Sequence, residues 1–182
     1  FGLFAMLAGC THVVAVAHIH PARQAATQPA MGKTTGDVVF TQQFGGVHVH
    51  AKLSGLPPGK HGIHIHENGD LSAADLSSAG GHFNPEHHLH GGPTTSPVHG
   101  GDLGNITADV SGNATLDLTV HNISIGGKND ILGKAVIIHA DADDLSSQPA
   151  GNAGPRLAGG VIEQKAPESA KKKASVEKND ND

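Results

Sequence analysis

Apolar and polar residues alternate with a period of two along much of this chain. The alternation is clearest at residues 47–54 and 114–120, where every second residue is apolar. A period of two places successive side chains on opposite faces of a β-strand. Six further short segments have the composition of strands: 13–19, 38–41, 63–67, 105–110, 135–139 and 157–162.

Turn-forming sequences separate these segments, among them Pro57-Pro58-Gly59, Ser111-Gly112-Asn113 and Gly126-Gly127. No window has the apolar spacing of a convincing amphipathic helix. About eight short, half-buried strands predict an all-β fold, an antiparallel sandwich or barrel. Residues 67–103 and 140–156 interrupt the pattern as two long loops. Because the first contains five histidines, we expect it to be functional rather than disordered.

Composition narrows the chemistry to histidine. The chain has 182 residues, enough for one domain, and 15 histidines against a single cysteine. One cysteine excludes thiolate metal sites and disulfide bonds within the chain. A formal net charge of −5 argues against nucleic-acid binding by charge. With aromatic residues at 3%, the core must consist of aliphatic side chains.

The two ends differ from the body. Residues 1–10 are apolar and end in Leu7-Ala8-Gly9-Cys10, like the back half of a bacterial lipoprotein signal. This partial signal predicts export to the periplasm or cell envelope and a possible membrane tether through a lipidated Cys10. The alternative is a buried N-terminal strand with an incidental cysteine. We expect one domain over residues 11–163 and a disordered, charged tail over 164–182.

Three His-x-His pairs occur in the predicted strands. On a strand, both imidazoles of such a pair lie on one face, with Cα atoms about 6.6 Å apart. We expect His48 and His50 to face solvent, because their neighbours Val47, Val49 and Ala51 form the buried set. His18 and His20 fit a surface position or loose metal capture. His64 and His66 run directly into the histidine-rich loop, which favours a ligand role.

The first loop and one strand end supply further ligands. His82, His90, His99 and Asp102 offer three imidazoles and one carboxylate, a set typical of zinc in tetrahedral geometry. His139 follows an apolar strand and could join His64 and His66 in an all-nitrogen site suited to Cu(II). The alternative is a merely solvated histidine-rich loop. Neither set requires His87 or His88, which we expect at the surface.

These residues lie in motifs that follow one another along the chain: His64-Ile65-His66-Glu67, Gly81-His82-Phe83-Asn84-Pro85, His90-Gly91-Gly92-Pro93, His99 with Gly101-Asp102-Leu103-Gly104-Asn105, Ile138-His139, Asp143-Asp144-Leu145 and Gly151-Asn152-Ala153-Gly154-Pro155-Arg156-Leu157. From about Thr11 to Glu163 the chain closely resembles Cu/Zn superoxide dismutase. The resemblance implies an eight-stranded antiparallel Greek-key β-barrel that converts superoxide to dioxygen and hydrogen peroxide.

The resemblance also implies roles for individual residues. Copper is expected on His64, His66, His82 and His139, and zinc on His82, His90, His99 and Asp102, one ion of each per subunit. His82 would bridge the two ions and exchange a proton during turnover. Asp143 would link a copper-binding and a zinc-binding imidazole, and Arg156 would attract the superoxide anion. The alternatives are a copper/zinc buffer or delivery module with little turnover and a zinc-stabilised adhesion sandwich.

The chain departs from the family pattern at two places. The disulfide that usually ties the first loop to the barrel would fall at Leu76, or its neighbour, and Gly159, and neither is cysteine. We expect zinc and an apolar contact of Leu76 to anchor this loop instead. The second loop has Asp141, Asp143 and Asp144 but no lysine. Steering of the substrate would then rest on Arg156 and the metals, with Lys60 and Lys134 as further candidates. The sequence leaves open a monomer or homodimer, and the roles of His12, His18 and His20.

Overall fold

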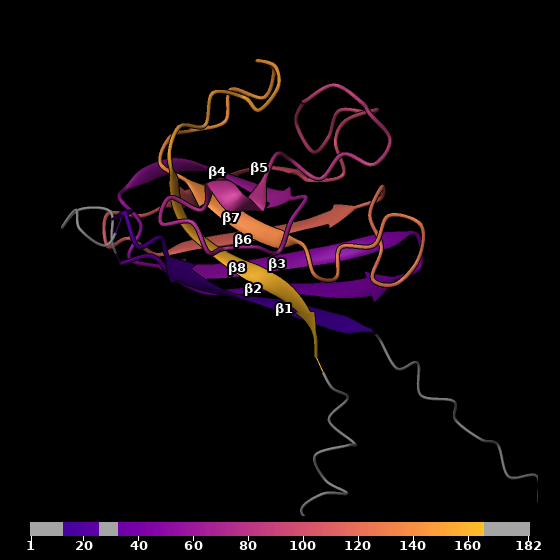
Figure 1. Ribbon diagram of the computed structural model, residues 1–182, viewed down its shortest axis with the longest axis horizontal. Helices are drawn as coiled ribbons and strands as arrows, with labels where there is room; N and C mark the ends of the chain where they lie inside the picture. Colours follow the sequence, from indigo (N-terminus) through magenta and orange to yellow (C-terminus); the bar gives the residue numbers. More distant parts are fainter. Residues whose placement is uncertain (1–12, 26–32, 166–182) are drawn as a thin grey trace, which may run out of the picture.

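The computed structural model describes residues 13–25 and 33–165, and their eight strands close into one barrel (Figure 1). The strands are β1 Val14–Pro21, β2 Thr35–Gln43, β3 Gly46–Ser54, β4 Gly59–His66, β5 Asp102–Ala108, β6 Ala114–Val120, β7 Ala135–His139 and β8 Arg156–Gln164. Around the barrel they follow the order β1-β2-β3-β6-β5-β4-β7-β8, and every pair is antiparallel. The predicted all-β barrel is confirmed.

The strand positions follow the predicted segments, with shifts at the ends. β4 begins at Gly59, because Lys60 and His61 pair with Thr107 and Ile106 on β5. At the C-terminal side, Gln164 pairs with Ala15, and the amide of Lys165 donates to Val14 O over 2.8 Å. The first two residues assigned to the charged tail therefore lie against β1, which corrects the domain boundary. Three segments lie outside the described residues: 1–12, 26–32 and the rest of the tail, 166–182.

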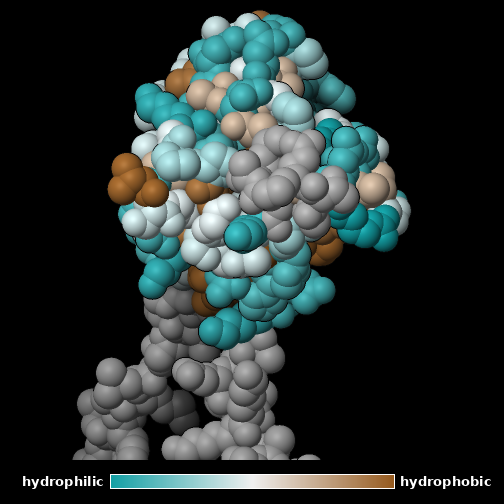
Figure 2. Space-filling model, turned by 90° about the vertical axis from the view of Figure 1, so that its left-hand side faces the viewer, coloured by the Kyte–Doolittle hydropathy of each residue, from teal (hydrophilic) through white to brown (hydrophobic). Residues whose placement is uncertain are grey.

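Alternation along each strand fills the barrel interior with aliphatic side chains. On β3, Val47, Val49 and Ala51 have no exposed surface, while the alternating positions face outward. The largest interior side chain is Phe40, surrounded by isoleucines and leucines from the other strands. The large hydrophobic residues that do reach the surface are scattered, and the face in Figure 2 is mainly hydrophilic with isolated hydrophobic residues. Among the described residues, no helix has the length and apolar character needed to cross a bilayer.

Both long loops lie on the same side of the barrel, beside β4, β5 and β7 (Figure 1). β4 is therefore buried on both faces from His61 onward: one face packs in the barrel and the other beneath the loops. The second loop is joined to β4 by a hydrogen bond of 2.8 Å from the amide of Gly62 to Asp141 O. Side chains on the outer face of β4 thus meet residues from both loops.

Leu76 anchors the first loop to the barrel. It precedes a short 3-10 turn, Ser77–Ala79, and is 5% exposed in a small apolar cluster that includes Ile137. A Cβ atom placed on Gly159 would lie 3.3 Å from Leu76 Cδ1, so the leucine side chain packs directly over that glycine of β8. An apolar contact therefore occupies the position where the family resemblance places a disulfide.

Replacing Leu76 with alanine should destabilise the zinc-free protein by about 2–4 kcal/mol, because the removed methyl groups leave a cavity over Gly159. Urea unfolding followed by circular dichroism measures the change. The matched control is Leu89→Ala, since Leu89 is 71% exposed and its loss should change the free energy of unfolding by less than about 0.5 kcal/mol. Equal effects of the two substitutions would show that Leu76 is not the anchor.

Candidate metal centre

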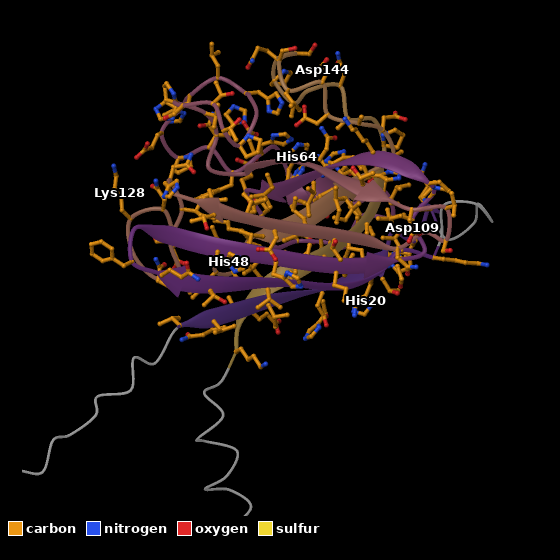
Figure 3. The ribbon with its side chains drawn as sticks, turned by 180° about the vertical axis from the view of Figure 1, so that it is seen from behind. His20, His48, His64, Asp109, Lys128 and Asp144 are labelled. Atoms are coloured by element: carbon orange, nitrogen blue, oxygen red, sulfur yellow. The ribbon has the colours of Figure 1, made fainter. Side chains whose placement is uncertain are left out.

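Four histidines meet on the outer face of β4 beneath the loops. His64 and His66 project from β4, and His139 ends the neighbouring strand β7. A backbone bridge between His66 and His82 brings the loop histidine beside them. All four are at most 8% exposed, and one nitrogen of each lies within 4.8 Å of the others. Figure 3 shows His64 between the barrel and the loops.

A second group shares His82. Asp102 Oδ1 lies 2.9 Å from His82 Nδ1 and 3.0 Å from His90 Nδ1. The same oxygen is 3.2 Å from His99 Nδ1. All four residues are buried, and their candidate ligand atoms lie within 4.8 Å of one another. Three ring nitrogens therefore converge on one carboxylate oxygen, as in a closed tetrahedral site.

Hydrogen bonds on the outer side of each ring fix which nitrogen faces the first group. His66 Nδ1 lies 2.9 Å from Gly80 O, and His139 Nδ1 lies 3.1 Å from Gly154 O. A carbonyl oxygen can only accept, so each Nδ1 carries the proton and each Nε2 is left with an unprotonated lone pair. The two Nε2 atoms lie 3.4 Å apart. His64 is turned the other way, with Nε2 2.9 Å from Asp143 Oδ2 and Nδ1 toward the group.

Three buried ring nitrogens have no hydrogen-bond partner among the described residues: His64 Nδ1, His82 Nε2 and His99 Nδ1. An unpaired buried polar atom costs about 1–3 kcal/mol, so a fold that retains three needs a ligand for them. The donor sets fit copper and zinc: four imidazoles suit Cu(II), and three imidazoles with one carboxylate suit zinc. The residues present therefore fit both metals.

Burial also keeps these rings in the metal-binding protonation state. Desolvation, reinforced by repulsion from neighbouring imidazoles, lowers the pKa of His64 to about 4, that of His139 to about 3 and that of His66 to about 2. A neutral imidazole has the lone pair that a metal ion requires. At neutral pH no proton has to be displaced from these three rings.

Asp143 connects the two groups. Its Oδ2 accepts from His64, and its Oδ1 lies 3.0 Å from His90 Nε2. Burial raises the pKa of this carboxyl, but the hydrogen bonds from His64, His90 and the Leu145 amide outweigh burial, and the net pKa is lowered. Gly151 allows Asp143 and His90 to come this close, since a Cβ atom at residue 151 would lie 1.8 Å from Asp143 Oδ1. One charged carboxylate thus orients one ring in each group.

Two positioning contacts were not predicted from the sequence. Gln148 binds the backbone of His90 twice: it accepts from His90 N over 2.9 Å and donates to His90 O over 3.0 Å. The buried ring of His61 lies 2.9 Å from His139 O and 2.8 Å from Pro57 O. Neither residue belongs to a motif or a periodic pattern that signals its role. Only the folded loops bring these partners together.

Arg156 lies at the open side of the first group. Its guanidinium donates to Leu76 O over 2.5 Å and to Gly80 O over 2.6 Å. Together with His66, His82 and His139 it lines a cavity of about 310 Å³. Half-burial lowers the pKa of Arg156, but a guanidinium remains charged in proteins. The cavity therefore presents one fixed positive charge next to the first group.

Apart from the buried His61, the remaining histidines of the described residues lie at or near the surface, where we expected His48, His50, His87 and His88. His18, His20, His50 and His87 are exposed, and His48 and His88 are half-buried. His88 Nδ1 lies 3.2 Å from Val98 O, so it is not part of either group. His12 lies outside the described residues.

Comparisons with known proteins agree with this geometry. Residues 34–162 match the family described as copper/zinc superoxide dismutase. An extracellular superoxide dismutase [Cu-Zn] of Haemonchus contortus is 44% identical over 136 residues, which cover 71% of this chain and 74% of that protein. One from Brugia pahangi is 39% identical over 140 residues, covering 72% and 70% respectively.

Among solved structures, a crystal structure of the clock protein EA4 has a TM-score of 0.72 and 42% identity, covering 85% of this chain and 96% of that one. The family match spans most of the barrel and both histidine groups. The chain therefore belongs to the copper/zinc superoxide dismutase family.

Proposed function

We propose that this protein catalyses the dismutation of superoxide to dioxygen and hydrogen peroxide. The observation that carries the proposal is the position of His82. Its two ring nitrogens serve two buried ligand groups, and the first group opens to a cavity lined by Arg156. A redox centre with the positive charge of Arg156 at its opening suits superoxide, a small anion that acts both as oxidant and as reductant.

We assign copper to His64, His66, His82 and His139, and zinc to His82, His90, His99 and Asp102. The unpartnered nitrogens and the outward hydrogen bonds of the rings support this division. Asp143 would keep His64 and His90 in the required tautomers, because both rings donate to it from Nε2. Gln148 would hold the backbone of His90 in place.

When bound, copper supplies one-electron redox chemistry and zinc supplies a fixed positive charge. The net reaction consumes two superoxide anions and two protons, and gives one dioxygen and one hydrogen peroxide. Arg156 would bind each anion in the cavity. His82 would hold one of the protons at Nε2 and deliver it to the reduced product, while Nδ1 remains on the side of Asp102. The second proton would come from solvent through the open cavity.

A copper/zinc buffer or delivery module would need the same ligands, but it would not need an anion-binding group. Arg156 is half-buried and fixed by two carbonyl oxygens at the cavity. This placement favours the enzyme over the buffer.

We also propose that the protein is exported and attached to the cell envelope by a lipid on Cys10. The curated relatives carry the name extracellular superoxide dismutase, which supports export. The sequence Leu7-Ala8-Gly9-Cys10 supports the lipid anchor. These residues lie outside the described ones, so the anchor rests on sequence alone.

Replacing Arg156 with alanine should lower the superoxide decay rate per copper by on the order of tenfold, because Arg156 is the only lysine or arginine among the described residues that line the cavity. Pulse radiolysis of protein with confirmed copper and zinc content measures this rate. The Arg156→Lys variant keeps the positive charge but loses the guanidinium that donates to two carbonyl oxygens. Its superoxide decay rate should therefore lie between those of the wild type and Arg156→Ala. An unchanged rate in Arg156→Ala would remove its role in anion binding.

Replacing Asp143 with asparagine should weaken zinc binding by about 10- to 100-fold, because one amide cannot accept from both His64 and His90. Competition with a chromophoric chelator measures the affinity. Asp141→Asn is the matched control, since Asp141 is exposed on the same loop and contacts neither ring. A zinc affinity equal to that of the control would contradict the orienting role of Asp143.

The catalytic rate should depend weakly on salt, changing less than about threefold between low ionic strength and about 0.2 M salt. The loop between His139 and Arg156 contains three aspartates and no lysine. Lys134, another candidate for steering, donates to Glu67 O over 3.0 Å and packs over Phe83. A steep fall of the pulse-radiolysis rate with added salt would show that long-range steering operates by another route.

Mass spectrometry of the N-terminal peptide of the native protein tests the lipid anchor. We expect a diacylglycerol group on Cys10, because the cysteine follows an apolar stretch and small residues. A mature peptide that contains unmodified Cys10, or that begins beyond it, would exclude the lipoprotein hypothesis without affecting the enzymatic proposal.

A further inference from the structure

A second kind of histidine cluster lies on the outside of the barrel. His48 and His50 alternate with buried residues on β3, and Asp117 on β6 pairs with His50 in the strand register. All three side chains therefore project from the outer face of the sheet. Figure 3 shows His48 on the side of the barrel away from His64 and the loops. This outer cluster is separate from the two buried groups.

The two imidazoles share one carboxylate. His48 Nε2 lies 2.5 Å from Asp117 Oδ1, and His50 Nδ1 lies 2.7 Å from Asp117 Oδ2. Hydrogen bonds from His50 and His48 lower the pKa of Asp117, so the carboxylate is charged at neutral pH. Among the described residues, the ion pairs of Asp117 are with these two histidines. No lysine or arginine in the described part of the chain forms an ion pair with this carboxylate.

We propose that His48, His50 and Asp117 form an outer binding site for a divalent transition-metal ion of the zinc or copper(II) class. Two imidazoles and one carboxylate are a common donor set for such ions, and water would complete the shell. The His-x-His spacing directs both rings to the same side of β3. Asp117 supplies the third ligand from the adjacent strand.

Binding requires the side chains to turn toward one another, because the candidate ligand atoms of His48, His50 and Asp117 do not all lie within 4.8 Å of one another, as those of each buried group do. The rings now contact opposite oxygens of the carboxylate at hydrogen-bond distances. An ion with bonds of about 2.0–2.2 Å would hold neighbouring ligand atoms about 3.3 Å apart. The side chains are 32%, 47% and 62% exposed for His48, His50 and Asp117, so they can turn without disturbing the core. The ion would replace the protons between the rings and the carboxylate.

The barrel contains its own control for this inference. His18 on β1 contacts Asp37 on β2 over 2.6 Å, in the same strand-to-strand arrangement. His20 lies on the same face of β1, but among the described residues Asp37 contacts His18 alone, so its carboxylate holds one imidazole instead of two. It should therefore bind a metal ion much more weakly than the outer cluster.

The experiment uses the full protein with both buried sites filled, as confirmed by elemental analysis. Equilibrium dialysis against buffered Zn(II) at neutral pH then counts additional zinc per chain. We expect one additional zinc in the wild type, with affinity reduced at least about tenfold in Asp117→Asn and in His50→Gln. His18→Gln should bind the additional zinc like the wild type.

Two results would overturn the proposal. One is a loaded wild-type protein that takes up no additional zinc. The other is additional zinc that persists in Asp117→Asn and His50→Gln, or that is reduced equally in His18→Gln, because this would indicate diffuse binding by surface histidines. Circular dichroism of each variant verifies the fold, which the exposure of the three substituted side chains should leave intact.

Discussion

The metal centre depends on the placement of one imidazole, that of His82, between two buried groups of ligands. Backbone hydrogen bonds hold its loop against β4: Phe83 N donates to Ile65 O over 2.8 Å, and Ile65 N donates to Gly101 O over 2.9 Å. Gly101 makes this approach possible, since a Cβ there would lie 2.1 Å from Ile65 O. Phe83, which follows His82, and Gly101, which precedes Asp102, are thus fixed to the same strand, and this brings His82 and Asp102 together from distant parts of the chain.

The first loop is held by one apolar and one polar contact that meet at the same place. Leu76 packs its side chain over Gly159, while its carbonyl accepts from Arg156. Arg156 also donates to Gly80 O, the oxygen that accepts from His66 Nδ1. The anchor of the loop, the position of the Arg156 guanidinium and the orientation of the His66 ring therefore depend on one short stretch of backbone. A disulfide in this position would provide covalent closure, and here packing and hydrogen bonds take its place.

The strands and the ligands could be predicted from the sequence for different reasons. Alternating apolar residues determine which face of β3 or β6 is buried, so the strands could be predicted from this period. The His-x-His pairs follow the same period, and together with the loop motifs they indicated which histidines lie close together. The contacts of Gln148 with His90 and of His61 with His139 could not be predicted, because each joins a side chain to backbone atoms of a residue distant in sequence. The end of β8 was also missed at Gln164, since its pairing with Ala15 outweighs the polar character of the segment.

The most direct test is a crystal structure of the metal-loaded protein with anomalous scattering measured at the copper and zinc absorption edges. We predict a copper peak on the Nε2 side of the His82 ring, among His64, His66 and His139, and a zinc peak on the Nδ1 side, among His90, His99 and Asp102. Two peaks that share the His82 ring would establish the bridged centre. A single peak, or two metals without His82 as a common ligand, would contradict it.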